Sequence, residues 1–152
     1  MDHGGASPLN QTAVSATLHC LTGCAIGEVL GMVIGTAAGF GKWTTVALAV
    51  ALAFFFGFFL TMRPLLKSGM ALGGAVSLAF ASDFFSISVM EIVDNAIMLS
   101  IPGAMDAHLS SPLFWGSLTV ALAIAFWAAF PLNRYLITRG KGHAVIHANH
   151  AH

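Results

Sequence analysis

The chain has 152 residues, of which 57% are hydrophobic and only 8% are charged, and its mean hydropathy is +0.84. A soluble domain carries about a quarter charged residues, so this chain cannot cover its surface with solvated side chains, and a lipid bilayer is its expected partner. Six basic residues balance six acidic ones, which gives no electrostatic support for nucleic-acid binding. The length leaves room for one domain of roughly four spans of about 20 residues each.

Four apolar stretches predict four spans, at about residues 12–39, 43–62, 69–101 and 111–133. Arg63 and Pro64 predict the end of the second span, because proline and charge are both poorly tolerated in a membrane helix. Ser110 or Ser111 as a helix cap, with Pro112 in the first turn, predicts the start of the fourth. The predicted fold is therefore an all-α, four-helix transmembrane bundle.

The spans form one predicted membrane domain over residues 12–135, between a polar lead (1–11) and a histidine-rich tail (136–152). Five of the six basic residues lie where they would share one side of the membrane: Arg63, Lys67, Arg134, Arg139 and Lys141. The positive-inside rule then places both termini, and the tail, in the cytoplasm. Histidine-rich tracts can capture metal, although a short exposed tail is more often unstructured.

Polar and small residues follow a four-residue period in the first span. Cys20, Cys24 and Glu28 form one row, since residues i and i+4 are neighbours on a helix. A carboxylate in lipid is expensive, so it normally faces a protein interior, a water-filled cavity or an ion. Glycines repeat with the same period and let a second helix approach closely: Gly23, Gly27, Gly31, Gly35 and Gly39. This glycine face (Gly23 to Gly39) could pack against a membrane partner or a second copy.

The third span carries an acidic stripe. At 100° per residue, five polar or sulfur-bearing side chains fall within an arc of about 120°: Asp83, Glu91, Asp94, Asn95 and Met98. Three acidic residues on one stripe of a spanning helix are hard to explain by packing alone. Counted from the outer ends of their spans, Glu28 and Glu91 lie at similar depth, near the midplane. We therefore expect the first and third spans to share a site.

One chemistry that fits is transition-metal binding or transfer. Imidazole, thiol, carboxylate and thioether groups together form a metal-ligand set: His19, Cys20, Cys24, Glu28, Glu91, Asp94 and Met98. Soft sulfur ligands favour Cu(I), whereas imidazole and carboxylate suit Zn(II), Fe(II) or Cu(II), so copper is the first expectation. The alternative is that Cys20 and Cys24 are small buried hydrophobes and that Met98 fills a gap in the core.

A second chemistry is proton or cation conduction along a carboxylate relay made of Asp83, Glu28, Glu91 and Asp94. The same carboxyl groups could instead form a structural network that fixes helix register, and a third role is a structural or assembly subunit of a membrane complex. The sequence has no nucleophile elbow, phosphate-binding loop or dinucleotide fingerprint. No catalytic residue is therefore predicted, and an enzyme is not the expectation.

Several motifs resemble an uncharacterised bacterial family of four-span inner-membrane proteins that carry a domain of unknown function. The motifs are His19-Cys20-Leu21-Thr22-Gly23-Cys24 with Glu28, Met90-Glu91-Ile92-Val93-Asp94-Asn95 and Pro102-Gly103-Ala104-Met105-Asp106. The resemblance covers the chain from about Ala16 to Arg134. In some relatives the same domain is appended to copper-oxidase-like proteins. The resemblance thus implies a bacterial cytoplasmic (inner) membrane location and an association with copper, and it supplies no catalytic residues.

Overall fold

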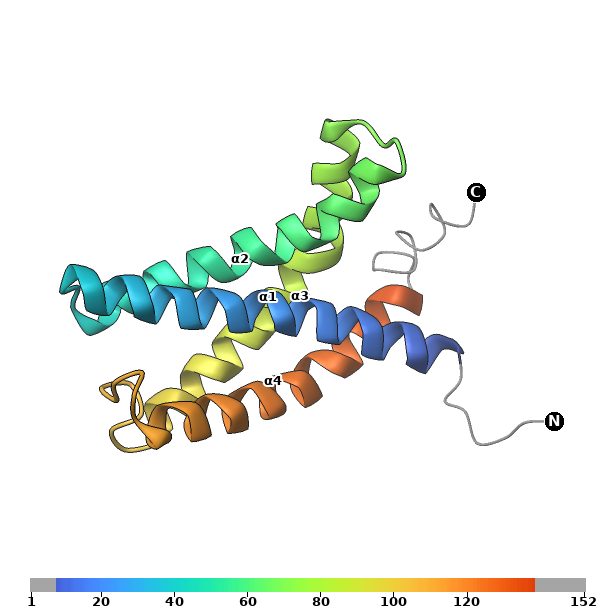
Figure 1. Cartoon of the computed structure of the whole chain (residues 1–152). Helices are drawn as coiled ribbons and strands as arrows, with labels where there is room; N and C mark the ends of the chain where they lie inside the picture. The colour runs from blue at the N-terminus through green and yellow to red at the C-terminus, as the bar shows by residue number, and fades with distance from the viewer. Residues whose placement is uncertain (1–7, 139–152) are drawn as a thin grey trace.

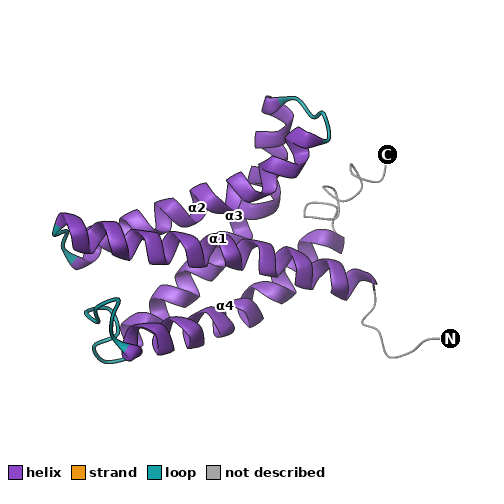
Figure 2. Ribbon diagram, in the orientation of Figure 1, coloured by secondary structure: helices purple, strands orange, loops and turns teal. Residues whose placement is uncertain are grey.

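The computed structural model describes residues 8–138, which form four α-helices joined by short connections (Figure 1). The helices are α1 (Pro8–Ala38), α2 (Lys42–Lys67), α3 (Leu72–Ser100) and α4 (Pro112–Thr138). The described residues contain no strand (Figure 2). All four helices are long and apolar enough to cross a membrane. The predicted all-α bundle of four apolar helices is therefore confirmed.

Three of the helices are longer than the predicted spans, whereas α3 is slightly shorter than the predicted span at 69–101. α1 begins at Pro8, four residues before the predicted start, and α4 continues through Pro131 to Thr138. α2 does not end at Pro64 but runs one turn further, to Lys67. Proline lacks only its own N–H, and the Pro64 carbonyl still accepts a hydrogen bond of 3.0 Å from the backbone N–H of Ser68. The helix can therefore complete its last turn.

The start of α4 agrees with its sequence signals. The backbone N–H of Leu113 donates to the Ser111 hydroxyl at 3.2 Å, and Pro112 is the first helical residue. Proline suits this position because its missing N–H would have no partner within the helix. The connection between α3 and α4, residues 101–111, and the short turn between α1 and α2 lie at the same end of the bundle (Figure 1). We call this the loop end.

α1 and α2 pack against each other in opposite directions with a four-residue register, which we call the glycine seam. The facing pairs are Gly23 with Gly57, Gly27 with Ala53, Gly31 with Ala49, and Gly35 with Thr45. A Cβ atom at Gly31 would lie only 2.6 Å from the Ala49 Cα, and one at Gly23 only 2.7 Å from the Gly57 Cα. The two backbones can approach this closely only because glycine has no side chain.

The glycine face predicted from the sequence is therefore covered by α2 of the same chain. Gly39 lies beyond the seam, in the turn after α1, where its φ of 70° is the left-handed conformation that glycine adopts readily. A homodimer or membrane partner on this face would have to displace α2. Partner binding there stays a prediction that a single chain does not test.

The outer surface of the bundle is apolar and part of its interior is polar. Ile92 and Trp127 are each 70% exposed, as expected of side chains that contact lipid tails. The buried polar side chains include Thr17, Glu28, Asp83, Ser86, Glu91, Asp94 and Asn133. The lead at residues 1–7 and most of the histidine-rich tail, residues 139–152, lie outside the described residues. The chemistry in the described part is thus concentrated between the helices.

Candidate functional site

The row of polar residues on α1 faces α3. The Cys20 Sγ lies 3.9 Å from Asp83 Oδ1, and the Cys24 Sγ lies 4.0 Å from the Met90 Sδ. The paired residues advance along both helices together, so α1 and α3 run in the same direction. We call this contact the polar seam; its residues are Cys20, Cys24 and Glu28 on α1 and Asp83, Ser86, Met90, Glu91 and Asp94 on α3.

Three carboxyl groups meet at one level of the polar seam, and we call them the carboxyl cluster. Glu28 interacts electrostatically with both Glu91 and Asp94. The three residues are only 4%, 5% and 2% exposed, respectively. The structure therefore brings together the acidic residues of the first and third spans that the sequence placed at similar depth.

The carboxyl cluster has unused hydrogen-bonding capacity. Glu28 Oε2, Glu91 Oε2 and Asp94 Oδ1 are buried, and none of them has a hydrogen-bond partner among residues 8–138. None of the three groups forms an ion pair with a basic residue within residues 8–138, where Lys42 pairs instead with Asp106. Buried carboxyl groups without partners are unfavourable unless they hold protons or a bound cation. The cluster thus has the chemistry of a proton-binding or cation-binding site.

Asp83 forms a separate group on the polar seam. It is fully buried, and its Oδ1 accepts a hydrogen bond of 3.1 Å from the Ser82 hydroxyl. The Cys20 thiol lies 3.9 Å from the same oxygen, and the Thr61 hydroxyl, on α2, lies near this carboxyl group. Eight residues separate Asp83 from Glu91, which is about 12 Å along a helix at 1.5 Å per residue.

Thiol and hydroxyl groups fill the space between Asp83 and the carboxyl cluster. Ser86 lies near Cys20, and Cys24 lies near Glu91. Both groups can donate and accept hydrogen bonds, although the thiol does so weakly. The four carboxyl groups of the predicted relay therefore lie along one line of polar side chains between α1 and α3, in which Cys20 interacts electrostatically with Cys24.

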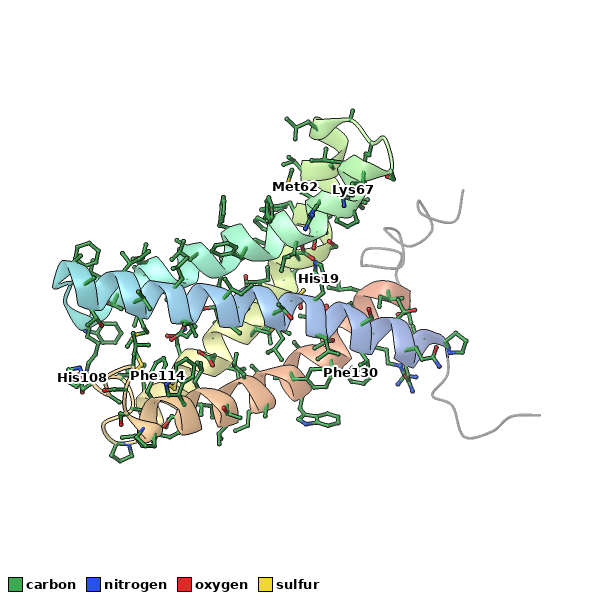
Figure 3. All side chains as sticks on the ribbon, viewed as in Figure 1. His19, Met62, Lys67, His108, Phe114 and Phe130 are labelled. Carbon is green, nitrogen blue, oxygen red and sulfur yellow. The ribbon has the colours of Figure 1, made fainter. Side chains whose placement is uncertain are left out.

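The predicted metal-ligand set is not gathered in one place. Within residues 8–138, no group of three or more His, Cys, Asp and Glu side chains is arranged to hold a metal ion. Met98 is buried in a different cluster, with Phe114 and Leu118 near the loop end. His19 is half-buried in the part of α1 nearer its N-terminus, where Figure 3 labels it. The thiols of Cys20 and Cys24 contact different acceptors.

Met90 is a residue that the sequence analysis missed. It is fully buried, and its sulfur, rather than that of Met98, contacts a cysteine. Met90 lies 100° from Glu91 on a helical projection, outside the arc that marked the acidic stripe. Met90 lies opposite Cys24 because of the register between α1 and α3. That register cannot be derived from a single sequence.

Asn133 is the second missed residue, because it was assigned to the end of the fourth span. It is 2% exposed, and its side-chain amide donates to the Thr17 hydroxyl at 3.0 Å, which joins α4 to α1. A signal was present in the sequence: buried alanines repeat every four residues before it, at Ala121, Ala125 and Ala129. Continuing that period by one turn puts Asn133 on the buried face of α4.

Within residues 8–138, four helices that are long and apolar enough to cross a membrane surround a buried carboxyl cluster, which is the architecture of a small multi-pass membrane protein of the all-α class. A family model described as a domain of unknown function (DUF4396) matches residues 9–142, and the chain belongs to this family. No curated protein and no solved structure matches the chain. The bacterial inner-membrane location and the association with copper-oxidase-like proteins stay predictions.

Proposed function

We propose that the protein carries protons or small monovalent cations across the membrane, with the carboxyl cluster as its binding site. The observation that supports this is the set of three buried carboxyl groups. In the described part of the chain, each has an oxygen without a hydrogen-bond partner, and none is paired with a basic residue. A membrane interior disfavours such groups unless they hold a proton or a cation. A purely structural network would use its hydrogen bonds within the protein.

The line of polar groups supports a route along the polar seam. Asp83 acts as a second proton-binding site, which we call the Asp83 station, and a proton reaches it from Glu91 through Cys24, Ser86 and Cys20. Cys20 lies beside Asp83 and Ser86, and Cys24 lies beside Glu91. A proton can pass along this line by short steps once side-chain motion brings Cys20 and Cys24 together. The positive-inside rule puts the termini in the cytoplasm, and the Asp83 station then lies on the cytoplasmic side of the carboxyl cluster in a bacterial inner membrane.

Flux through proteoliposomes tests this proposal. Protein is reconstituted with a pH-sensitive dye inside the vesicles, and parallel vesicles receive labelled Na⁺ to distinguish the two cargoes. We expect Glu91→Gln, which keeps the shape but removes the titrating group, to lower the flux at least tenfold. Ser100→Ala on the same helix is the control, because the exposed Ser100 hydroxyl bonds only to the Ala96 carbonyl of its own helix. Full flux in Glu91→Gln would exclude the proposal.

Copper binding is a second candidate, supported by the contact between Cys24 and Met90. If two sulfur atoms each lie about 2.3 Å from one ion and the sulfur–ion–sulfur angle is about 120°, they are about 4.0 Å apart. The Cys24 Sγ and the Met90 Sδ are 4.0 Å apart. A thiolate with a thioether selects Cu(I) over harder ions. The Glu91 carboxyl lies beside Cys24 and would be the third group near such an ion.

Elemental analysis of the purified protein separates the two candidates. If Cu(I) binds between the sulfurs, the double substitution Cys24→Ser with Met90→Leu removes copper, and Met98→Leu does not. Copper that persists in the double variant would exclude this pair as the site. A protein that neither conducts cations nor holds copper would leave the structural or assembly role.

A further inference from the structure

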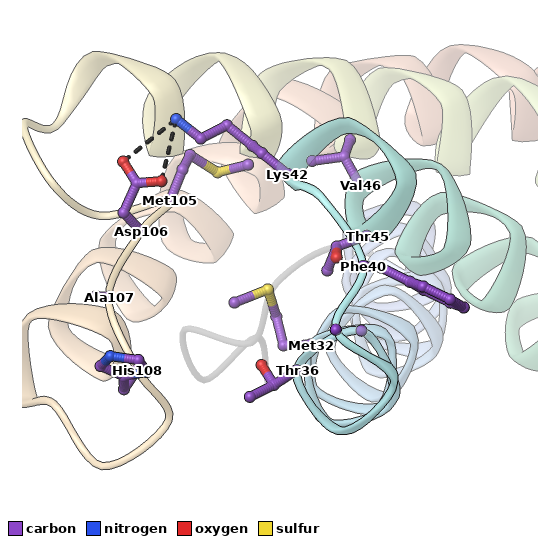
Figure 4. Close-up of a pocket in the computed structure, with 12 residues that line it drawn as sticks. Met32, Thr36, Phe40, Lys42, Thr45, Val46, Met105, Asp106, Ala107 and His108 are labelled. Carbon is purple, nitrogen blue, oxygen red and sulfur yellow. Dashed lines mark hydrogen bonds and ion pairs between the residues drawn. The ribbon is translucent and has the colours of Figure 1, made fainter.

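A pocket of about 300 Å³ opens at the loop end and has no part in the route described so far. Its walls come from the last turns of α1, the first turns of α2 and the connection between α3 and α4 (Figure 4). Thr36 and Thr45 contribute hydroxyl groups, and Asp106 and His108 line the side formed by the connection. The pocket therefore lies at one end of the bundle and has both polar and apolar side chains in its walls.

The pocket leads toward the carboxyl cluster. Met32 lines the pocket and lies four residues after Glu28 on α1, which is one helical turn, or about 6 Å. Met32 packs against the cluster of buried residues that contains Met98. Along α1, the apolar side chain of Met32 thus forms a layer between the pocket and the level of Glu28. Methionine is unbranched and flexible, so a rotation of Met32 can open such a layer without moving a helix.

One ion pair crosses the pocket. The Lys42 Nζ lies 3.2 Å from both carboxylate oxygens of Asp106, which ties the start of α2 to the connection between α3 and α4 (Figure 4). The two side chains are 38% and 69% exposed. Exposed ion pairs of this kind are weak and are screened by salt. The pair can therefore open and close on the timescale of side-chain motion.

We infer that this pocket is the port through which cations enter or leave the carboxyl cluster, and that the ion pair between Lys42 and Asp106 holds it closed. The inference rests on the proposed function. While the pair is formed, the Lys42 ammonium group remains in the pocket wall and repels cations. When the pair opens, the Asp106 carboxylate is free to attract a cation from water, and the walls of the pocket can separate above Met32.

Thiol labelling tests the port. Thr36→Cys is treated with a positively charged, membrane-impermeant thiol reagent, added to each side of the vesicles in turn. The native Cys20 and Cys24 are each 1% exposed, so the unsubstituted protein should not react. We expect Thr36→Cys to react from one side only and its flux to fall at least fivefold relative to the same protein before labelling.

Ser110→Cys is the matched control. Ser110 is exposed in the same connection but does not line the pocket, so its labelling should leave the flux unchanged. If labelled Thr36→Cys keeps its flux, or does not react from either side, the port is excluded, although the loss of flux in Glu91→Gln would still support the carboxyl cluster. If Glu91→Gln keeps full flux, the proposed function and the port are both excluded.

Substitutions at Lys42 and Asp106 test whether their ion pair holds the pocket closed. In the Thr36→Cys background, Lys42→Gln breaks the pair and removes the charge that repels the reagent, so it should raise the labelling rate roughly threefold, a modest effect because exposed ion pairs are weak. The exchange of both charges, Lys42→Asp with Asp106→Lys, should return the rate to its original value by restoring the pair in the opposite sense. Equal labelling rates in all three proteins would show that the ion pair does not close the pocket.

Discussion

α1 presents different chemistry to its two neighbours in the glycine seam and the polar seam. Toward α2 it offers glycines, and the backbones themselves are in contact. Toward α3 it offers thiols and a carboxyl group, and side chains fill the space. Gly27 and Glu28 are adjacent in the chain, yet they belong to the two different seams. One helix can thus separate packing from chemistry, because neighbouring residues point in directions about 100° apart.

The difference indicates what each seam contributes. Close backbone contact gains dispersion energy over its whole length and leaves no polar group without a partner. The carboxyl cluster leaves three oxygens without partners, which lowers stability. Stability should therefore depend mainly on the glycine seam, and transport on the polar seam.

The largest effect on stability is expected in the glycine seam. A Cβ at Gly27 would overlap backbone atoms of Ala53, which cannot move away without separating the helices. We expect Gly27→Ala to lower the free energy of unfolding by about 3 kcal/mol, the upper end of the usual cost of overpacking. The measurement is reversible unfolding in mixed detergent micelles.

Gly116→Ala is the control for this substitution, since nothing lies within 4 Å of a Cβ at Gly116. Alanine is also the better helix former, so the control should be neutral or slightly more stable. Equal stability of the two variants would show that α1 and α2 do not depend on close contact.

A polar contact outside the polar seam should affect stability but not flux. Asn133→Ala removes the hydrogen bond to Thr17, which still donates to the Ala13 carbonyl at 2.7 Å. The expected loss is about 0.5–1.5 kcal/mol, typical of a hydrogen bond between membrane helices. Thr119→Ala, which removes only a contact within α4, serves as the control. A tenfold loss of flux in folded Asn133→Ala would show that the transport route includes α4. It would also show that transport does not depend on the polar seam alone.

The smallest effect on stability is expected at the loop end. Lys42→Gln removes the ion pair with Asp106 and should change the free energy of unfolding by less than about 1 kcal/mol, because both side chains are substantially exposed. High salt should have a similarly small effect on the unsubstituted protein. A loss as large as that of Gly27→Ala would mean that the pair is part of the structural framework.

The sequence predicted the helices and the acidic stripe because both depend on local periodicity. Hydropathy located four helices, and Pro112 located the start of α4. The spacing of Glu91 and Asp94 put them on one face, and counting from the helix ends put Glu28 at their depth. These inferences need only the helical repeat and the thickness of the membrane.

Features that depend on how helices pack could not be predicted. Met90 lies opposite Cys24 because of the register between α1 and α3, and that register is set by side-chain packing along the whole length of both helices. Met98 shares the stripe with Glu91 but lies two turns nearer the loop end, in a separate cluster. The residues of one stripe therefore divide between two environments, and the seven predicted metal ligands are not gathered at one point within residues 8–138.

The central claim is that Glu28 and Asp94, on different helices, form one site with Glu91. A double-mutant cycle on cation flux tests this claim most directly, with Glu28→Gln, Asp94→Asn and their combination in reconstituted vesicles. If each single substitution lowers the flux about tenfold, we expect the double variant to lose little more, because residues that act as a unit are not additive. A double variant with a loss of about a hundredfold, the product of two independent effects, would contradict a shared site.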